Sequence, residues 1–266
     1  MLLIQSAPEQ LFTPNHKFKN QLALLNLIND ANKKTAHRGT AETIILNLLD
    51  SLTIATASLL DNLDTHHETA IAIWRTQYES AVILRNFIQT LVVNHDPKLF
   101  AQLCDRYADY QVISAMQVFK DDNYQLLNQV KRKYYHASPE LTLQYDYDWA
   151  KPLFTTKQLK KCYQPYRLGF RDLVYKGNLI DQRLTNLLDY YSLASNMVHV
   201  TPISAEVSHS ITDYHLKNIT NTVLNCALSD YVELLLALYQ PVKMTSVTKK
   251  LLNTLTTWHN NLPKLS

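Results

Sequence analysis

The sequence predicts an all-α protein, a single-domain bundle of about eight to ten helices. Apolar residues recur at helical spacing along most of the 266 residues, and the chain has only 3 glycines, where a usage of roughly 7% would give about 19. Sheet-rich folds and phosphate-binding loops need glycine, because it enters positive-φ turns at little cost. Neither G-x-G-x-x-G nor G-x-x-x-x-G-K-S/T occurs. The glycine content therefore argues against a β-sandwich, a β-barrel or a dinucleotide-binding fold.

Composition and charge favour a folded cytoplasmic protein. With 46% hydrophobic and 18% charged residues the chain can bury a large core, so we do not expect disorder. The net charge of +3 is small for a nucleic-acid-binding domain. Cys104, Cys162 and Cys226 form no C-x-x-C pair. This spacing argues against a disulfide framework or structural zinc and fits a reducing cytoplasm.

No segment of the sequence is typical of a signal peptide or a membrane span. The N-terminal sequence MLLIQSAPEQ lacks a basic region followed by an apolar one. The longest apolar region, 44–60, is interrupted by Asn47 and Asp50. We therefore expect a buried core helix there and no membrane association.

The N-terminal half of the chain predicts five helices, each with apolar residues three or four positions apart. In the second of them, Ile44, Leu48 and Leu52 fall on one stripe. The third ends before Asp96 and Pro97, because Asp is a favoured N-cap and Pro a favoured first helical residue. The expected ranges are 20–34, 41–63, 68–93, 97–119 and 123–135.

The C-terminal half begins with an irregular segment, 136–177, which holds two of the 3 glycines. Short helices are expected within it and longer ones after it, and the chain shows no internal repeat or linker. We expect one domain over 1–266, with residues 1–18 irregular and the last helix, within 243–266, peripheral. The expected helices are 157–162, 166–174, 181–199, a long segment from Pro202 or Ser204 to Tyr239, and 246–260.

Arg75 and Glu79 form the first candidate site. Residues four apart share a helix face, so the two side chains are expected to pair. Arg75 and Arg85 also lie close to the apolar stripe that contains Trp74 and Tyr78. One interpretation is a structural ion pair between helices, because a buried guanidinium needs an acceptor. The other is that Arg75 offers its planar guanidinium to an anionic ligand.

Ser195 and His199 form the second candidate site, four residues apart near a predicted helix end. A helix C-terminus favours a protonated imidazole. His199 either ties the helix end to neighbouring carbonyl groups or acts as a general acid and base with Ser195 beside it. A serine nucleophile is not expected, because no glycine-flanked turn accompanies Ser195.

These motifs, taken in order, resemble a large family of uncharacterised bacterial helical proteins known as a domain of unknown function. The resemblance covers about 46–215 and depends on Arg75-x-x-x-Glu79, Asp105-Arg106-Tyr107, Asp146-Tyr147-Asp148-Trp149-Ala150 and Tyr191…Ser195…His199. The family commonly has glycine where this chain has Asp148. The resemblance implies a shared helical fold and a polar cluster of Arg75, Glu79, Ser195 and His199. It implies no particular reaction.

A second, weaker resemblance is to HEPN-type ribonucleases, helical proteins of bacterial toxin and phage-defence systems. Their catalytic motif is an arginine and a histidine with four to six residues between them. Here Ser195 stands in place of the arginine and the spacing to His199 is one residue short. Arg75 would have to supply the positive charge from another helix.

Other patterns indicate metal or nucleic-acid binding less strongly than helix capping or a solvated helix face. Glu206-x-x-His209 has a di-iron spacing but lacks the second motif and the further glutamates such sites need, and Asp64-x-x-His67 lies at a helix start. We expect no metal and no cofactor. Two basic segments contain aromatic residues and are candidates for RNA binding by charge and stacking. They are Lys131-Arg132-Lys133-Tyr134-Tyr135-His136 and Lys160-Lys161-Cys162-Tyr163.

The leading hypothesis is a protein of a regulatory or defence system that binds a small ligand or a protein partner through the cluster of Arg75, Glu79, Ser195 and His199. One alternative is a metal-independent ribonuclease with His199 as acid and base. Another is a helical scaffold that self-associates through tyrosine-rich faces. Further candidate contacts to a ligand or nucleic acid are Arg85, Lys131, Arg132, Lys133 and Trp149, the last in the segment expected to form a lid.

Overall fold

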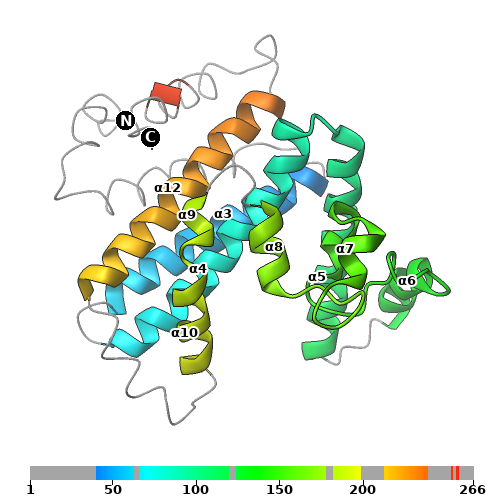
Figure 1. The fold of residues 1–266 in the computed structure, drawn as a ribbon, viewed down its shortest axis with the longest axis horizontal. Coiled ribbons are helices and arrows are strands. Elements are labelled where there is room, and N and C mark those ends of the chain that lie inside the picture. The colour runs from blue at the N-terminus through cyan, green and yellow to red at the C-terminus, as the bar shows by residue number, and fades with distance from the viewer. Residues whose placement is uncertain are drawn as a thin grey trace.

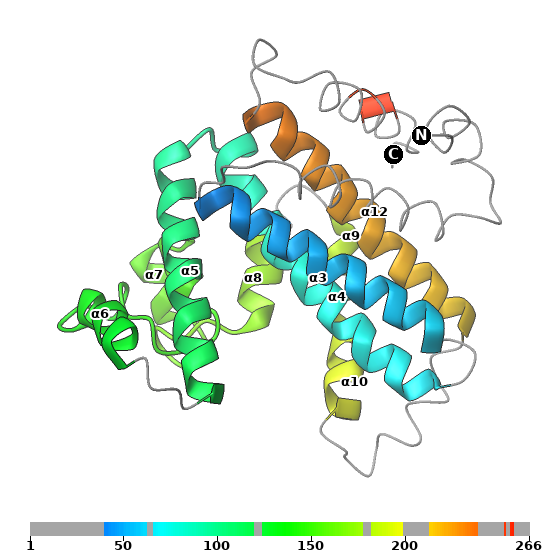
Figure 2. The same cartoon turned by 180° about the vertical axis from the view of Figure 1, so that it is seen from behind.

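Helix α4 (His67–Ile88) is the central element of the fold. Helices α3 (Thr40–Asn62) and α12 (Asp213–Leu238) run alongside it. Helices α5 (Pro97–Phe119), α6 (Tyr124–Tyr134) and α7 (Thr156–Lys160) lie together to one side of these three (Figures 1 and 2). The computed structural model describes residues 40–62, 66–119, 124–177, 182–198 and 213–238, together with residues 253, 256 and 257.

The described residues contain nine α-helices and no β-strand, which confirms the predicted all-α class for this part of the chain. A π-helix, η3 (Gln89–Val93), extends α4, and a 3-10 helix, η4 (Asp148–Leu153), lies in the irregular segment. None of the described helices combines the length and apolar character that crossing a membrane requires. The remaining α-helices are α5 (Pro97–Phe119), α6 (Tyr124–Tyr134), α7 (Thr156–Lys160), α8 (Phe170–Gly177), α9 (Gln182–Thr185) and α10 (Leu188–Val198).

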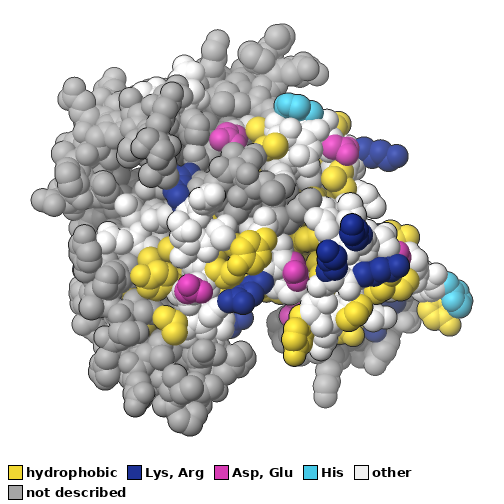
Figure 3. Space-filling view, viewed as in Figure 1, with side chains coloured by type: hydrophobic (Ala, Val, Ile, Leu, Met, Phe, Trp, Pro, Cys, Tyr) yellow, Lys and Arg dark blue, Asp and Glu magenta, His cyan; other side chains and the backbone are white. Residues whose placement is uncertain are grey.

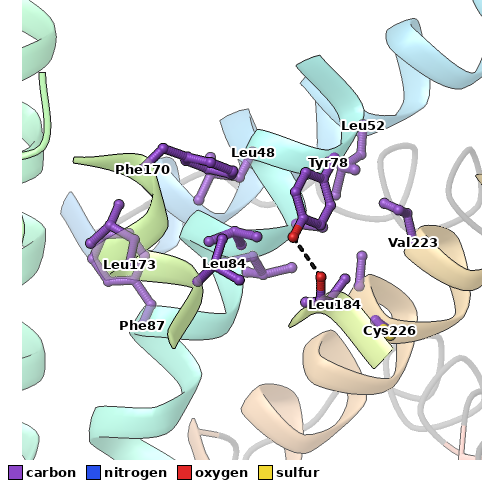
Figure 4. Close-up of a cluster of buried hydrophobic side chains, with 14 of the residues drawn as sticks. Leu48, Leu52, Tyr78, Leu84, Phe87, Phe170, Leu173, Leu184, Val223 and Cys226 are labelled. Atoms are coloured by element: carbon purple, nitrogen blue, oxygen red, sulfur yellow. Dashed lines mark hydrogen bonds between the residues drawn. The ribbon is translucent and has the colours of Figure 1, made fainter. Parts of the chain in front are cut away.

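Helix α4 occupies the centre because apolar side chains are buried on several of its faces. Figure 4 shows Tyr78, Leu84 and Phe87 of α4 among side chains from α3, α8 and α12. A helix that is apolar on most of its surface lowers its free energy by packing against neighbours on several sides. The core is therefore continuous from α3 across α4 to α12 and α8.

The predicted helix boundaries hold to within two residues for α3, α5 and α6. The predicted N-cap before Pro97 is confirmed, because the Asp96 Oδ1 atom accepts the Leu99 N–H at 2.9 Å. The third predicted helix, 68–93, changes to π-helix after Ile88. The helices predicted at 20–34 and 246–260 lie outside the described residues, except for residues 253, 256 and 257.

The helix predicted at 166–174 begins later, at Phe170. Tyr166 has a left-handed backbone with φ of 64°, which ends any helical run at that residue. The Asp172 carboxylate then accepts the Gly169 N–H at 2.8 Å and satisfies a donor at the new helix start.

The helix predicted at 181–199 is interrupted between Thr185 and Leu188. The Tyr78 hydroxyl donates a hydrogen bond to the Leu184 carbonyl at 2.5 Å, as Figure 4 shows. Leu187 N–H also donates to this carbonyl, at 3.1 Å, and forms a tighter turn there. A contact to α4 thus divides the predicted helix into α9 and α10.

The irregular segment before α7 is held by Arg106 of α5. The guanidinium donates to four backbone carbonyls, those of Leu141 at 3.2 Å, Thr142 at 3.2 Å, Asp148 at 2.7 Å and Trp149 at 3.0 Å. These bonds replace the regular backbone pairing that the segment lacks.

Asp148 stabilises the same segment from within. Its Oδ2 atom accepts the N–H groups of Gln144 at 2.9 Å and Tyr145 at 3.2 Å, and pairs with Lys151 at 3.0 Å. Asp148 has no positive φ, so this turn does not require glycine at that position.

Candidate functional site

Arg75 and Glu79 form the ion pair that their spacing predicts. The Arg75 Nη2 and Glu79 Oε1 atoms are 3.2 Å apart, and each side chain is 26% exposed. The hydroxyl of Tyr191, on α10, donates to the same Glu79 oxygen at 2.6 Å. The Arg75 guanidinium also lies 5.5 Å from the centre of the Tyr191 ring. Tyr191, rather than Ser195, therefore connects this pair to α10.

The Glu79 carboxylate accepts the hydroxyl of Tyr191 and lies near a second tyrosine, Tyr147. Burial, and then the nearby Glu79 charge, raise the pKa of Tyr191. The same two causes, with an added contribution from Tyr191, raise the pKa of Tyr147, which belongs to the D-Y-D-W-A motif. Both phenols are thus held in the protonated form that can donate hydrogen bonds. The R-x-x-x-E motif, Tyr147 and Tyr191 meet in one cluster.

Ser195 lies one helical turn beyond Tyr191 and lines a pocket. Its Oγ atom is buried and has no hydrogen-bond partner in the part of the chain that the structure describes. The pocket has a volume of about 790 Å³ and lies between the loop before α8, α8 itself and α10. Its lining comprises residues 163, 164, 167–172, 175, 191, 192 and 195.

Two arginines bring positive charge to the pocket. Arg167 donates to the Gln164 side chain at 2.7 Å and lies 4.4 Å from the centre of the Tyr145 ring. Arg171 is exposed and has no ion pair within the described residues. Asp172 is the acidic residue of the lining, and its carboxylate already accepts the Gly169 N–H.

The structure gives Arg85 a role in packing. Its guanidinium forms an ion pair with Asp230 of α12, and the two side chains are 8% and 3% exposed. The sequence leaves two interpretations of Arg85, a contact to a ligand and a structural ion pair between helices. The structure supports the second and corrects the candidate ligand contact to a buried pair between α4 and α12, because Asp230 satisfies the charge that burial would otherwise destabilise.

Trp149 likewise belongs to the core. Its ring is fully buried, stacks on Phe87 with centroids 5.3 Å apart and meets Tyr107 edge-on at 5.0 Å. An indole without an exposed face cannot stack on a nucleic-acid base. The assignment of Trp149 to a binding surface is therefore corrected to a packing role.

The three basic residues of α6 do not act alike. Lys133 pairs with Asp109 of α5 at 3.0 Å, and Tyr134 donates to the same carboxylate at 2.8 Å. Lys133 thus helps to hold α6 on α5. Lys131 and Arg132 are exposed and lie on a different element from the pocket.

His199 lies outside the described residues, so its proximity to Arg75 stays a prediction. Asp64, Glu206 and His209 of the two metal-like motifs also lie outside them. Within the described residues, no three His, Cys, Asp or Glu side chains gather as metal ligands would.

Comparison with known proteins adds no assignment. The chain matches no family model, no curated protein and no solved structure. The chemistry of the pocket and its surroundings is therefore the basis for a functional proposal.

Arg167 and Arg171 were not among the residues that the sequence motifs indicate. A signal for them exists, because residues 157–176 contain six Lys or Arg residues and a single Asp. Three tyrosines occur in the same stretch. This local charge excess is hidden in a net charge of only +3 for the whole chain.

Proposed function

We propose that the protein binds an anionic, phosphate-bearing ligand in the pocket between α8 and α10. The observation that carries this proposal is the presence around one cavity of Arg167, Arg171 and the Ser195 hydroxyl, which has no hydrogen-bond partner among the described residues. Guanidinium groups match the geometry of phosphate oxygens, with which they form paired hydrogen bonds. A buried hydroxyl without a partner has a desolvation cost that a ligand atom can offset.

The cluster of Arg75, Glu79 and Tyr191 stabilises the wall of the pocket that α10 forms. Tyr191 contributes to the lining and donates its hydroxyl hydrogen to Glu79. This bond fixes the tyrosine ring and the turn of α10 that carries Ser195. The guanidinium of Arg75 already has Glu79 and Tyr191 as partners, so we assign Arg75 to positioning and Arg167 and Arg171 to the ligand.

Pyrophosphate tests the proposal as a minimal ligand. A ligand that binds only the folded protein stabilises it by about 2.7 kcal/mol at a concentration 100 times its Kd. We expect pyrophosphate to raise the unfolding temperature of the full chain. Arg171→Ala should abolish most of that shift.

The matched control is Arg132→Ala, which removes another exposed arginine, from α6. This variant should keep the full response to pyrophosphate. An equal loss in both variants would mean that only net charge matters, and the proposal would fail. No stabilisation of the unmodified chain would also overturn it.

A further inference from the structure

We propose that the phosphate-bearing ligand is a single-stranded nucleic acid, which crosses α7 and places an unpaired base in the pocket. This inference rests on the proposed function, because the pocket is its end point. The α7–α8 surface, defined as Lys157, Lys160, Lys161, Tyr163, Arg167, Arg171 and Tyr175, would bind it.

Positive charge on this surface is concentrated on one side of α7. Lys157, Lys160 and Lys161 stand at positions i, i+3 and i+4, which share a helix face, and all three are exposed. Figure 3 shows dark blue side chains gathered over this helix. None of the three pairs with a carboxylate in the described residues. Among the described residues, Glu140 lies close enough to Lys160 for their charges to interact.

Such a row of lysines is unfavourable for the free protein. Like charges one helical turn apart repel, and α7 is only 5 residues long, so it has little helical stability of its own. A strand of phosphates would remove this repulsion and release counterions. Arg167 and Arg171 continue the positive charge from α7 to the pocket.

Exposed tyrosine rings distinguish a nucleic acid from other anions. Tyr163 is fully exposed at 101%, and Tyr175 is 59% exposed. Both line the pocket that contains the two arginines. Bases stack on exposed aromatic rings, and this stacking favours nucleic acids over acidic proteins, which lack planar bases.

The same rings favour a single strand over a duplex. In a duplex the bases are stacked on one another and cannot cover a tyrosine. A pocket of about 790 Å³ lies within the range that small-molecule sites occupy, so one nucleotide fits it. The α7–α8 surface thus has lysines that can bind the phosphate backbone, tyrosine rings on which bases can stack, and the pocket, which can hold one base.

Binding of labelled oligonucleotides to the full chain, followed by fluorescence anisotropy, tests the charge on α7. We expect oligouridine and oligothymidine of about 12 nucleotides to bind more tightly than a duplex of the same length. The triple variant Lys157→Gln/Lys160→Gln/Lys161→Gln should reduce the salt slope of log K by about 0.7 for each phosphate that a lysine no longer neutralises. The control Lys98→Gln/Lys131→Gln/Arg132→Gln removes three exposed cations elsewhere and should leave that slope unchanged.

Substitution of Tyr163 provides a separate test of stacking. Because this side chain is exposed, we expect its variants to fold normally. Tyr163→Ala should weaken oligonucleotide binding by about fivefold or more, whereas Tyr163→Phe keeps the ring and should retain it. Equal affinity in the Ala and Phe variants would overturn base stacking and with it the inference. A glutamate peptide that binds as tightly as the oligonucleotide would assign the surface to an acidic protein partner instead.

The two proposals fail in different ways. Pyrophosphate binding that depends on Arg171, with no oligonucleotide bound more tightly than a mononucleotide, would overturn this inference and leave the anion pocket in place. Absence of both pyrophosphate and oligonucleotide binding would overturn the proposed function as well.

Discussion

The three cysteines of the chain have different surroundings. Burial, with a smaller contribution from Asp105, raises the pKa of Cys104 to about 12. Cys104 and Cys226 are each only 1% exposed. Cys162 is half-buried, beside the fully exposed Tyr163 at the pocket. Burial raises the pKa of Cys162 too, but this residue is less buried than Cys104 and Cys226.

These differences predict selective alkylation. At pH 8 iodoacetamide should label Cys162 slowly and leave Cys104 and Cys226 unmodified, because the thiolate is the reactive form and the reagent needs access. In urea all three should react. Peptide mass spectrometry measures the labelling, and equal rates for Cys104 and Cys162 in the folded protein would contradict the burial of Cys104.

At the scale of elements, the turn after α6 carries a residue of an unusual type. His136 has φ of 63°, a left-handed conformation that usually favours glycine after a helix. His95 and Tyr166 have similar values of 50° and 64°, whereas no glycine of the described residues has a positive φ. Because glycine is scarce, residues with a side chain adopt these strained left-handed conformations in the turns.

Substitution at His136 should relieve part of this strain. His136→Gly should be more stable than His136→Ala by about 1 kcal/mol, because alanine retains the unfavourable contact of its Cβ atom. Both variants lose the ring contact with Tyr135, so it cancels in the comparison. Urea denaturation gives the difference in free energy of unfolding, and equal stabilities would show that the turn is unstrained.

Local patterns predicted some elements well, and distant contacts decided the others. The apolar spacing of α3, α5 and α6 is a property of each segment, and so is the i, i+4 pair of Arg75 and Glu79. The break between α9 and α10 depends on Tyr78, which is 106 residues away from Leu184. The spacing of neighbouring residues cannot indicate a contact between residues so far apart in the sequence.

The pocket was beyond prediction for the same reason. Its lining comes from residues 163–175 and from α10, and their meeting requires the packing of α8 and α10 against α4. Trp149 shows the converse, because its motif suggested a binding surface and its neighbours Phe87 and Tyr107 bury it. The sequence motifs indicated residues that belong to the core or to the site, but they could not show which of these side chains are exposed to solvent.

Across the whole molecule, buried tyrosines set a limit on stability at high pH. Burial raises the pKa of Tyr107 to about 12, above the value of about 10 for an unfolded chain. Burial also raises the pKa of Tyr78, Tyr134 and Tyr147. The folded protein therefore retains protons that the unfolded chain releases above pH 10.

The buried tyrosines make the stability of the protein depend on pH above about pH 10. The stability from these tyrosines is fully present below about pH 10 and is lost as the pH rises from there through about 12. Denaturation in urea at a series of pH values should show this fall in the free energy of unfolding. Tyr107→Phe should make the fall shallower, and a free energy that stays constant to pH 12 would contradict the burial of these phenols.

The contacts of Arg106 have a consequence for the order of folding. The carbonyl groups of 141, 142, 148 and 149 find their donor on α5. The irregular segment has few backbone hydrogen bonds of its own, so the entropy lost on ordering it is not offset until α5 has formed and supplies the Arg106 guanidinium. We therefore expect the segment to follow α5 along the folding pathway, and its amides to open to hydrogen exchange as one cooperative unit.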